Sequence, residues 1–188
     1  NVLEHAYQEI MDSTKTTVYK DRSGNLRRIE NIYDKGENLK LINNTFLEYL
    51  SRVFFEDYVI FKDKFNAKPP GGEGFFAHYD GIFRWIDKDG NEKNGWHYYA
   101  KKFVNVVVAI DEMNSANGPL EIAKEHKGSF KDLLINTKNN GTPDLNEEVE
   151  SSLVFEKICI EPGDIVLFSN KCPHRSDKNS SHLDRRTI

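Results

Sequence analysis

Cysteine is scarce in this chain of 188 residues, which contains only Cys159 and Cys172. Two cysteines do not make a disulfide framework, so we predict reduced thiols in a cytoplasmic protein. No signal peptide or targeting segment is visible. The chain starts inside a helical pattern and stops within an apparent strand at Thr187, so we expect truncation at both ends. The missing signal therefore carries little weight for the compartment.

Long hydrophobic runs and a strong excess of one charge are also lacking. The longest apolar run, residues 103–110, has the length of a strand and not of a membrane span. The net charge of −4 at pH 7 argues against general nucleic-acid binding. We therefore expect neither a nucleic acid nor a membrane as a partner. The length suits a single domain over residues 1–188, and the sequence leaves its oligomeric state open.

The pattern of apolar residues changes along the chain. Helical spacing predicts helices over residues 2–11 and 44–56, the second capped by Asn43 or Asn44. A turn is expected at residues 21–25 and a polar loop at residues 136–150. Short apolar runs between Gly/Pro turns predict strands at residues 58–68, 75–83, 103–110, 120–123, 155–160 and 165–169. Many short strands after N-terminal helices predict a mainly β fold, a barrel or jelly roll.

The triplet His78-Tyr79-Asp80 is a candidate metal motif, and His174 is a candidate third ligand. Residues i and i+2 of a strand point to the same face, so His78 and Asp80 can reach one metal ion while Tyr79 faces away. Two histidines and one carboxylate are the ligand set of non-haem Fe(II) oxygenases. The triplet alone is a weak signal, and a strand end with two solvated polar residues explains it equally well.

Several segments in a fixed order resemble one protein family over about residues 64–187. They are Lys68-Pro69-Pro70-Gly71-Gly72, His78-Tyr79-Asp80, Asn117-Gly118-Pro119-Leu120, Pro162-Gly163-Asp164-Ile165, His174-Arg175-Ser176 and Arg185-Arg186. The order is similar to that of the phytanoyl-CoA dioxygenase-like branch of the Fe(II)/2-oxoglutarate oxygenases. The resemblance implies a double-stranded β-helix, with His78, Asp80 and His174 binding Fe(II). Three protein ligands leave positions for the keto acid and dioxygen.

The resemblance also implies a binding site for the cosubstrate 2-oxoglutarate. Arg185 stands where the family places the arginine that binds the distal carboxylate, and Ser176 matches a position that hydrogen-bonds the same group. Lys68 is expected to reach the cosubstrate, with Lys64 as a further candidate. Asn105 interrupts a run of valines, and it either lines this pocket or satisfies backbone groups.

Other positions depart from the family pattern or stay open. His126 follows Lys124-Glu125 where the family has Gly-Ser, and we interpret it as structural. Val107 stands where some members have tryptophan, which leaves more room in the pocket. Lys64 and Arg84 favour an anionic substrate.

The predicted function is hydroxylation of a small metabolite by an Fe(II)- and 2-oxoglutarate-dependent dioxygenase, with release of succinate and CO2. Asp80 favours hydroxylation, because related halogenases lack this carboxylate. Ectoine-type and acyl-CoA-type substrates stay open. The alternative is a metal-binding jelly roll of the cupin type that acts as a ligand-binding module or isomerase, in which Arg185 would have no evident purpose.

Overall fold

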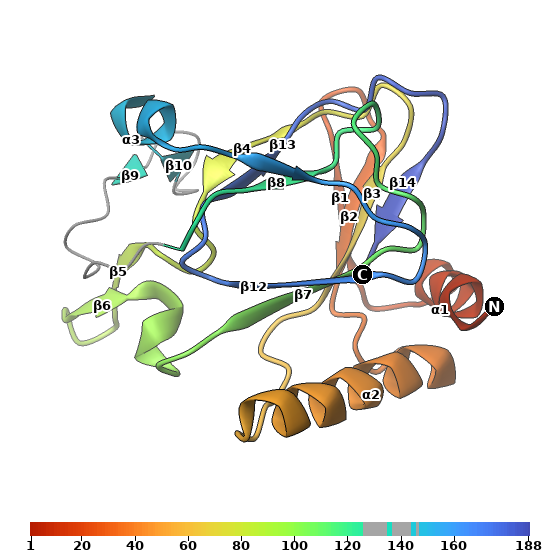
Figure 1. Ribbon diagram of the computed structural model, residues 1–188. Coiled ribbons are helices and arrows are strands. Elements are labelled where there is room, and N and C mark those ends of the chain that lie inside the picture. The colour runs from red at the N-terminus through yellow and green to blue at the C-terminus, as the bar shows by residue number, and fades with distance from the viewer. Residues whose placement is uncertain (126–134, 137–143, 146) are drawn as a thin grey trace.

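The computed structural model describes residues 1–125, 135–136, 144–145 and 147–188 (Figure 1). No helix in these ranges is both long and apolar enough to cross a membrane. The helices are α1 (Val2–Met11), α2 (Glu37–Phe54) and α3 (Glu147–Ser152), with a 3₁₀ turn η1 (Gly95–Tyr98). The strands are β1 (Thr17–Lys20), β2 (Leu26–Glu30), β3 (Lys64–Lys68), β4 (Phe75–His78), β5 (Arg84–Ile86), β6 (Glu92–Asn94), β7 (Val104–Val108), β8 (Leu120–Ile122), β9 (Ile135–Asn136), β10 (Asp144–Leu145), β11 (Glu156–Ile158), β12 (Ile165–Ser169), β13 (His174–Ser176) and β14 (Arg185–Thr187).

Two antiparallel sheets form the body of the protein. One has the order β1-β2-β3-β14, and a bridge from Thr187 to Ala109 joins it to the pair β7-β12. The other has the order β11-β8-β13-β4. Within each sheet, strands that are distant in sequence lie side by side, such as β3 with β14 and β13 with β4 (Figure 1). This is the predicted jelly roll, mainly β with helices at the N-terminus.

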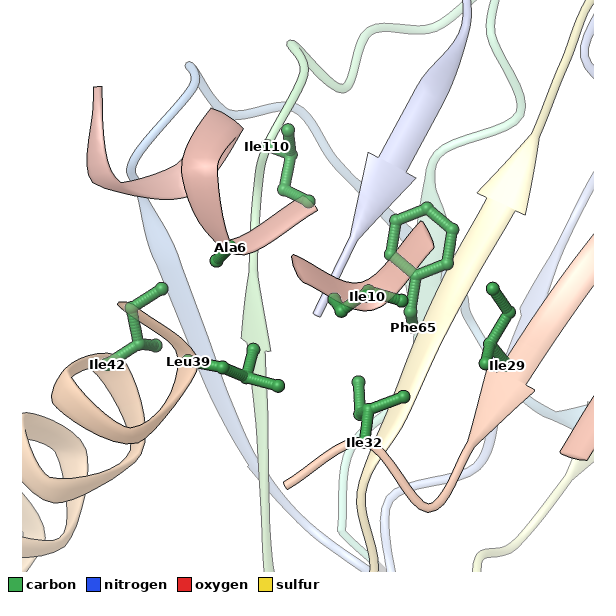
Figure 2. Close-up of a cluster of buried hydrophobic side chains, with 8 residues drawn as sticks. All are labelled: Ala6, Ile10, Ile29, Ile32, Leu39, Ile42, Phe65 and Ile110. Atoms are coloured by element: carbon green, nitrogen blue, oxygen red, sulfur yellow. The ribbon is translucent and has the colours of Figure 1, made fainter. Parts of the chain in front are cut away.

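The main hydrophobic core lies between the first sheet and the two N-terminal helices. Phe65 on β3 is fully buried and packs with Ile29 of β2 against residues of α1 and α2 (Figure 2). Because side chains alternate along a strand, β3 turns Phe65 toward the helices and its neighbours Lys64 and Asn66 toward the opposite face. One strand thus anchors the core and lines the space between the sheets.

Helix α2 begins seven residues before the predicted start, and Asn43 and Asn44 do not cap it. Its N-cap is Gly36, which has no side chain to offer, and the carboxylate of Glu9 accepts hydrogen bonds from the backbone N–H groups of Asn38 and Leu39 instead. The cap therefore comes from α1, far away in the sequence. Local sequence patterns cannot reveal such a cap.

The strand predictions were right in position and mostly too long. Strand β3 begins at Lys64 and not at residue 58, and β4 ends at His78 and not at residue 83. The turn at residues 21–25 is confirmed, but the prediction missed the strands β1 and β2 on either side of it. The expected loop at residues 136–150 contains the start of α3, a helix of six residues that buries no side chain completely.

Replacement of Phe65 by alanine tests the importance of the core. The change removes a fully buried ring, so the free energy of unfolding should fall by about 3–5 kcal/mol, as denaturant titration would measure. Phe55→Ala is the matched control, because its side chain is 92% exposed and its loss should cost less than about 0.5 kcal/mol. Equal losses for the two variants would contradict this assignment of the core.

Candidate metal centre and the adjoining cavity

The three predicted metal ligands lie together between the sheets. His78 ends β4 and His174 begins β13, and the two are direct partners in the antiparallel register. The Nε2 atoms of His78 and His174 lie 3.7 Å and 3.5 Å from the two carboxylate oxygens of Asp80. One ligand atom from each residue falls within 4.8 Å of the others. This spacing suits a single metal ion.

Both histidine rings are held in the orientation that a metal site needs. The Nδ1–H of His78 donates to the carbonyl of Phe76 at 2.9 Å, and that of His174 donates to the carbonyl of Cys172 at 3.1 Å. A carbonyl can only accept, so each proton must sit on Nδ1. The Nε2 lone pairs are then free to face the metal position, as in most protein metal sites.

The charge states also suit a metal ion. Burial lowers the pKa of His174 and of His78, so both imidazoles are neutral and able to ligate at pH 7. Burial opposes ionisation of Asp80, but nearby positive charge, that of Lys64 foremost, outweighs it and lowers the pKa of this carboxyl. The site therefore offers two neutral nitrogen ligands and one anionic oxygen ligand.

Two asparagines hold Asp80 in place. The side-chain amide of Asn105 donates to Oδ2 of Asp80 at 3.0 Å, and that of Asn170 donates to the main-chain carbonyl of Asp80 at 3.2 Å. The sequence left open whether Asn105 lines a pocket or satisfies backbone groups; it lines the cavity and bonds the carboxylate. Asn170 was missed. It is almost fully buried, but an asparagine that follows an apolar strand has no pattern that sets it apart from a turn residue.

Gly81 gives the turn after Asp80 its shape. Its φ of +69° lies in the left-handed region, and a Cβ there would come within 2.2 Å of the Trp96 ring. The carbonyl of Gly81 also accepts a hydrogen bond from the backbone N–H of Trp96. The η1 turn is thereby fixed against the metal centre.

Arg185 is a buried cation that forms no ion pair with an acid in the described part of the chain. It lies opposite Lys68 in the pairing of β14 with β3, and its side chain contacts the sulfur of Met113 at 4.0 Å. Within the described part of the chain, its Nε is buried and has no acceptor. Burial lowers the pKa of Arg185 to about 10, so it keeps its charge at pH 7. A buried guanidinium with an unused donor fits a carboxylate ligand.

The adjacent Arg186 behaves differently. It faces the other side of β14 and forms ion pairs at 2.7 Å with Asp111 and Glu4. These two acids raise its pKa, with the hydrogen bond to Asp111 as the main cause. The two neighbouring arginines therefore lie in two different environments.

Lys68 is fixed beside Arg185. Its Nζ donates to Oγ of Ser176 at 2.8 Å, to the carbonyl of Gly118 at 3.1 Å and to the carbonyl of Asp177. Burial and the charge of Arg185 lower its pKa to about 7. Lys68 thus orients Ser176 and adds a second cation to the same corner of the site.

All seven predicted site residues line one cavity of about 790 Å³: His78, Asp80, His174, Arg185, Ser176, Lys68 and Asn105. Lys64 and Val107 line it as well. His126 lies outside the residues that the structure describes, and so does the side chain of Arg84. The arrangement places a candidate three-ligand metal position and a candidate anion-binding corner in one cavity.

Comparison with known proteins identifies the family. The sequence profile of the Phytanoyl-CoA dioxygenase (PhyH) family matches residues 34–187. The chain belongs to the phytanoyl-CoA dioxygenase family. Within this family it is 28% identical over 166 residues to a 2-aminoethylphosphonate dioxygenase of the uncultured bacterium HF130_AEPn_1, covering 87% of this chain and 57% of that protein. It is 28% identical over 134 residues to a methylphosphonate hydroxylase of Gimesia maris, covering 71% and 44%. The chain therefore spans about half the length of the curated relatives it matches.

Solved structures share the fold of this family member. The structure of EctD from S. alaskensis with 2-oxoglutarate and 5-hydroxyectoine superposes with a TM-score of 0.71 at 16% identity, over 99% of this chain and 64% of that one. The carbocyclase SnoK from nogalamycin biosynthesis superposes with a TM-score of 0.72 at 11% identity, over 98% and 70%. Identities this low establish a common jelly roll, and the chemistry has to be argued from the site.

Replacement of Asn105 by leucine tests whether this amide supports the metal centre. The variant keeps the size of the side chain and removes the hydrogen bond to Asp80, so affinity for Mn(II) should fall by roughly 10- to 100-fold in an EPR titration. Asn66→Leu is the matched control, since Asn66 lines the same cavity without a hydrogen bond to the three ligands. An unchanged affinity in Asn105→Leu would refute the supporting role.

The lowered pKa of Lys68 predicts a pH dependence of stability. Its pKa is about 7 in the folded protein against an ordinary 10.5, so the unfolded state binds more protons between these values. This group therefore makes the free energy of unfolding rise as the pH rises from about 7 to about 10. In Lys68→Met that contribution should vanish, and chemical denaturation across this range measures it. Lys88 is exposed, so the free energy of unfolding of Lys88→Met should change with pH as that of the parent protein does. The same pH dependence in Lys68→Met would refute the assignment.

Proposed function

We propose that the protein is an Fe(II)- and 2-oxoglutarate-dependent dioxygenase that hydroxylates a small anionic metabolite, with release of succinate and CO2. The observation that supports this most is the unpartnered Arg185 in the same cavity as the three-ligand group. A plain metal-binding jelly roll has no use for a buried cation at this place, because an unmatched buried charge destabilises the fold. A dicarboxylate cosubstrate gives it a purpose.

Each site residue has a separate task in this proposal. His78, Asp80 and His174 hold the metal ion, and Asn105 keeps one oxygen of Asp80 in place. Arg185 binds the distal carboxylate of 2-oxoglutarate, together with the hydroxyl of Ser176 that Lys68 orients. Iron and 2-oxoglutarate, once bound, supply the oxidative chemistry that converts a C–H bond into C–OH. The chain itself holds the reactants in a fixed geometry and shields them from water.

The charge of the cavity favours an anionic substrate. Eight basic and five acidic side chains line the cavity, in a chain whose net charge is −4. A cavity of this sign attracts anions and raises their local concentration. Two of the matched relatives are named for phosphonates, which are small anions. The Lys64 part of the sequence prediction is retained in this proposal, and that for Arg84 lies outside the described side chains.

Arg185→Ala tests the binding site for the cosubstrate. Addition of 2-oxoglutarate to the anaerobic Fe(II) protein should produce the weak visible charge-transfer band of the chelate. The band should need roughly 10- to 100-fold more 2-oxoglutarate in Arg185→Ala, because a charge-assisted pair is lost. Metal affinity should stay unchanged, since Arg185 contacts none of the three ligands.

Arg186→Ala is the matched control for this experiment. Arg186 is the next residue, and its ion pairs point away from the cavity. We expect lower stability from the loss of these pairs, with an unchanged dependence on 2-oxoglutarate. Absence of the band in the parent protein would refute the oxygenase function. A band of equal strength in Arg185→Ala would refute the role of Arg185.

A further inference from the structure

Strand β3 carries two lysines on its cavity face, and they have different surroundings. Lys64 and Lys68 both line the cavity. Four residues of strand separate them by roughly 13 Å between Cα atoms. Lys68 is saturated by three acceptors at the end of the strand next to Arg185. The side chain of Lys64, by contrast, makes no hydrogen bond or ion pair with any residue that the structure describes.

The acid nearest to Lys64 in the strand register is already engaged. Glu30 is the register partner of Lys64 in the pairing of β2 with β3. Its carboxylate oxygen Oε1 lies 3.1 Å from both Arg28 and Lys62. Arg28 and Lys62 therefore share this one carboxylate, and Lys64 is left as a cavity-lining cation without an ion pair in the described part of the chain.

The two lysines also lie in different parts of the site. Lys64 begins β3 and lines the cavity together with His78, Asp80 and His174. Lys68 ends the same strand and lies opposite Arg185 in the pairing of β3 with β14. The cavity thus has one cationic end at Lys68 and Arg185, and a second cation, Lys64, at the other end of β3.

We propose that Lys64 binds the anionic group of the substrate, a terminal phosphonate, phosphate or carboxylate, and so places the carbon to be hydroxylated beside the metal. This inference rests on the proposed function and names its substrate class. The Arg185 end is assigned to the cosubstrate, so a second anion needs a second cation. Lys64 is the cation that the described cavity wall offers without an internal partner. Its flexible ammonium accepts any of these oxyanions as a point charge.

Binding to the oxygen-free complex of the protein with Fe(II) and 2-oxoglutarate tests the inference. The probes are methylphosphonate, 2-aminoethylphosphonate and its carboxylate counterpart β-alanine, titrated by calorimetry and by the change that they cause in the visible band. At least one of them should bind the parent protein, and Lys64→Met should weaken it by about tenfold or more. Lys64→Arg should restore most of the affinity. The uncharged dimethyl ester of methylphosphonate should not distinguish Lys64→Met from the parent protein.

Lys62→Met is the matched control, because Lys62 lines the same cavity but is paired with Glu30. Both lysine variants should form the 2-oxoglutarate band as the parent protein does. No band in the parent protein would overturn the proposed function itself. A normal band with no binding of any probe, or with equal binding by Lys64→Met, would overturn only the role of Lys64. Loss of the metal or of the band in Lys64→Met would likewise overturn it, since Lys64 would then act through Asp80.

Discussion

The antiparallel pairing of β4 with β13 is the constraint on which the site depends. It sets His78 directly opposite His174, so two residues almost a hundred positions apart present their rings to one point. Because side chains alternate along a strand, a shift of one residue in this register would turn one histidine out of the site. The backbone carbonyls two residues before each histidine then fix the rings. The two histidines of the candidate metal centre are therefore placed by the sheet, and Asp80 is held in the following turn by Asn105 and Asn170.

Some charged side chains of the protein have an ion-pair partner and others do not, and this difference separates residues that stabilise the fold from residues of the candidate site. Glu121 is buried and is matched by Arg175 at 2.8 Å, and Arg186 is matched by Asp111 and Glu4. Arg185 is also buried, yet no described acid lies within ion-pairing distance of it, and Asp111 acts on it only as a more distant charge. An anion bound beside Arg185 would offset the cost of burying its charge. The unpaired state has a rationale only if a ligand from outside supplies the anion.

Features of the structure could be predicted from the sequence where they depend on neighbouring residues or on the order of motifs along the chain. The jelly roll, the turn at residues 21–25 and the group of His78, Asp80 and His174 could all be predicted. The start of α2 could not, because its cap is the carboxylate of Glu9 from another helix. Asn170 was missed for the same kind of reason: its partner, the carbonyl of Asp80, is brought to it only by the fold. Contacts between segments that are far apart in the chain leave no periodic signal along it.

Strand β3 connects the stability of the fold with the chemistry of the cavity. Phe65 faces the helices, whereas Lys64, Asn66 and Lys68 line the cavity. The alternation of a strand is rigid, so packing of Phe65 in the core fixes the positions of both lysines. The spacing of the two Cα positions is then set by the core, while the ammonium group of Lys64 can still adjust on its flexible side chain.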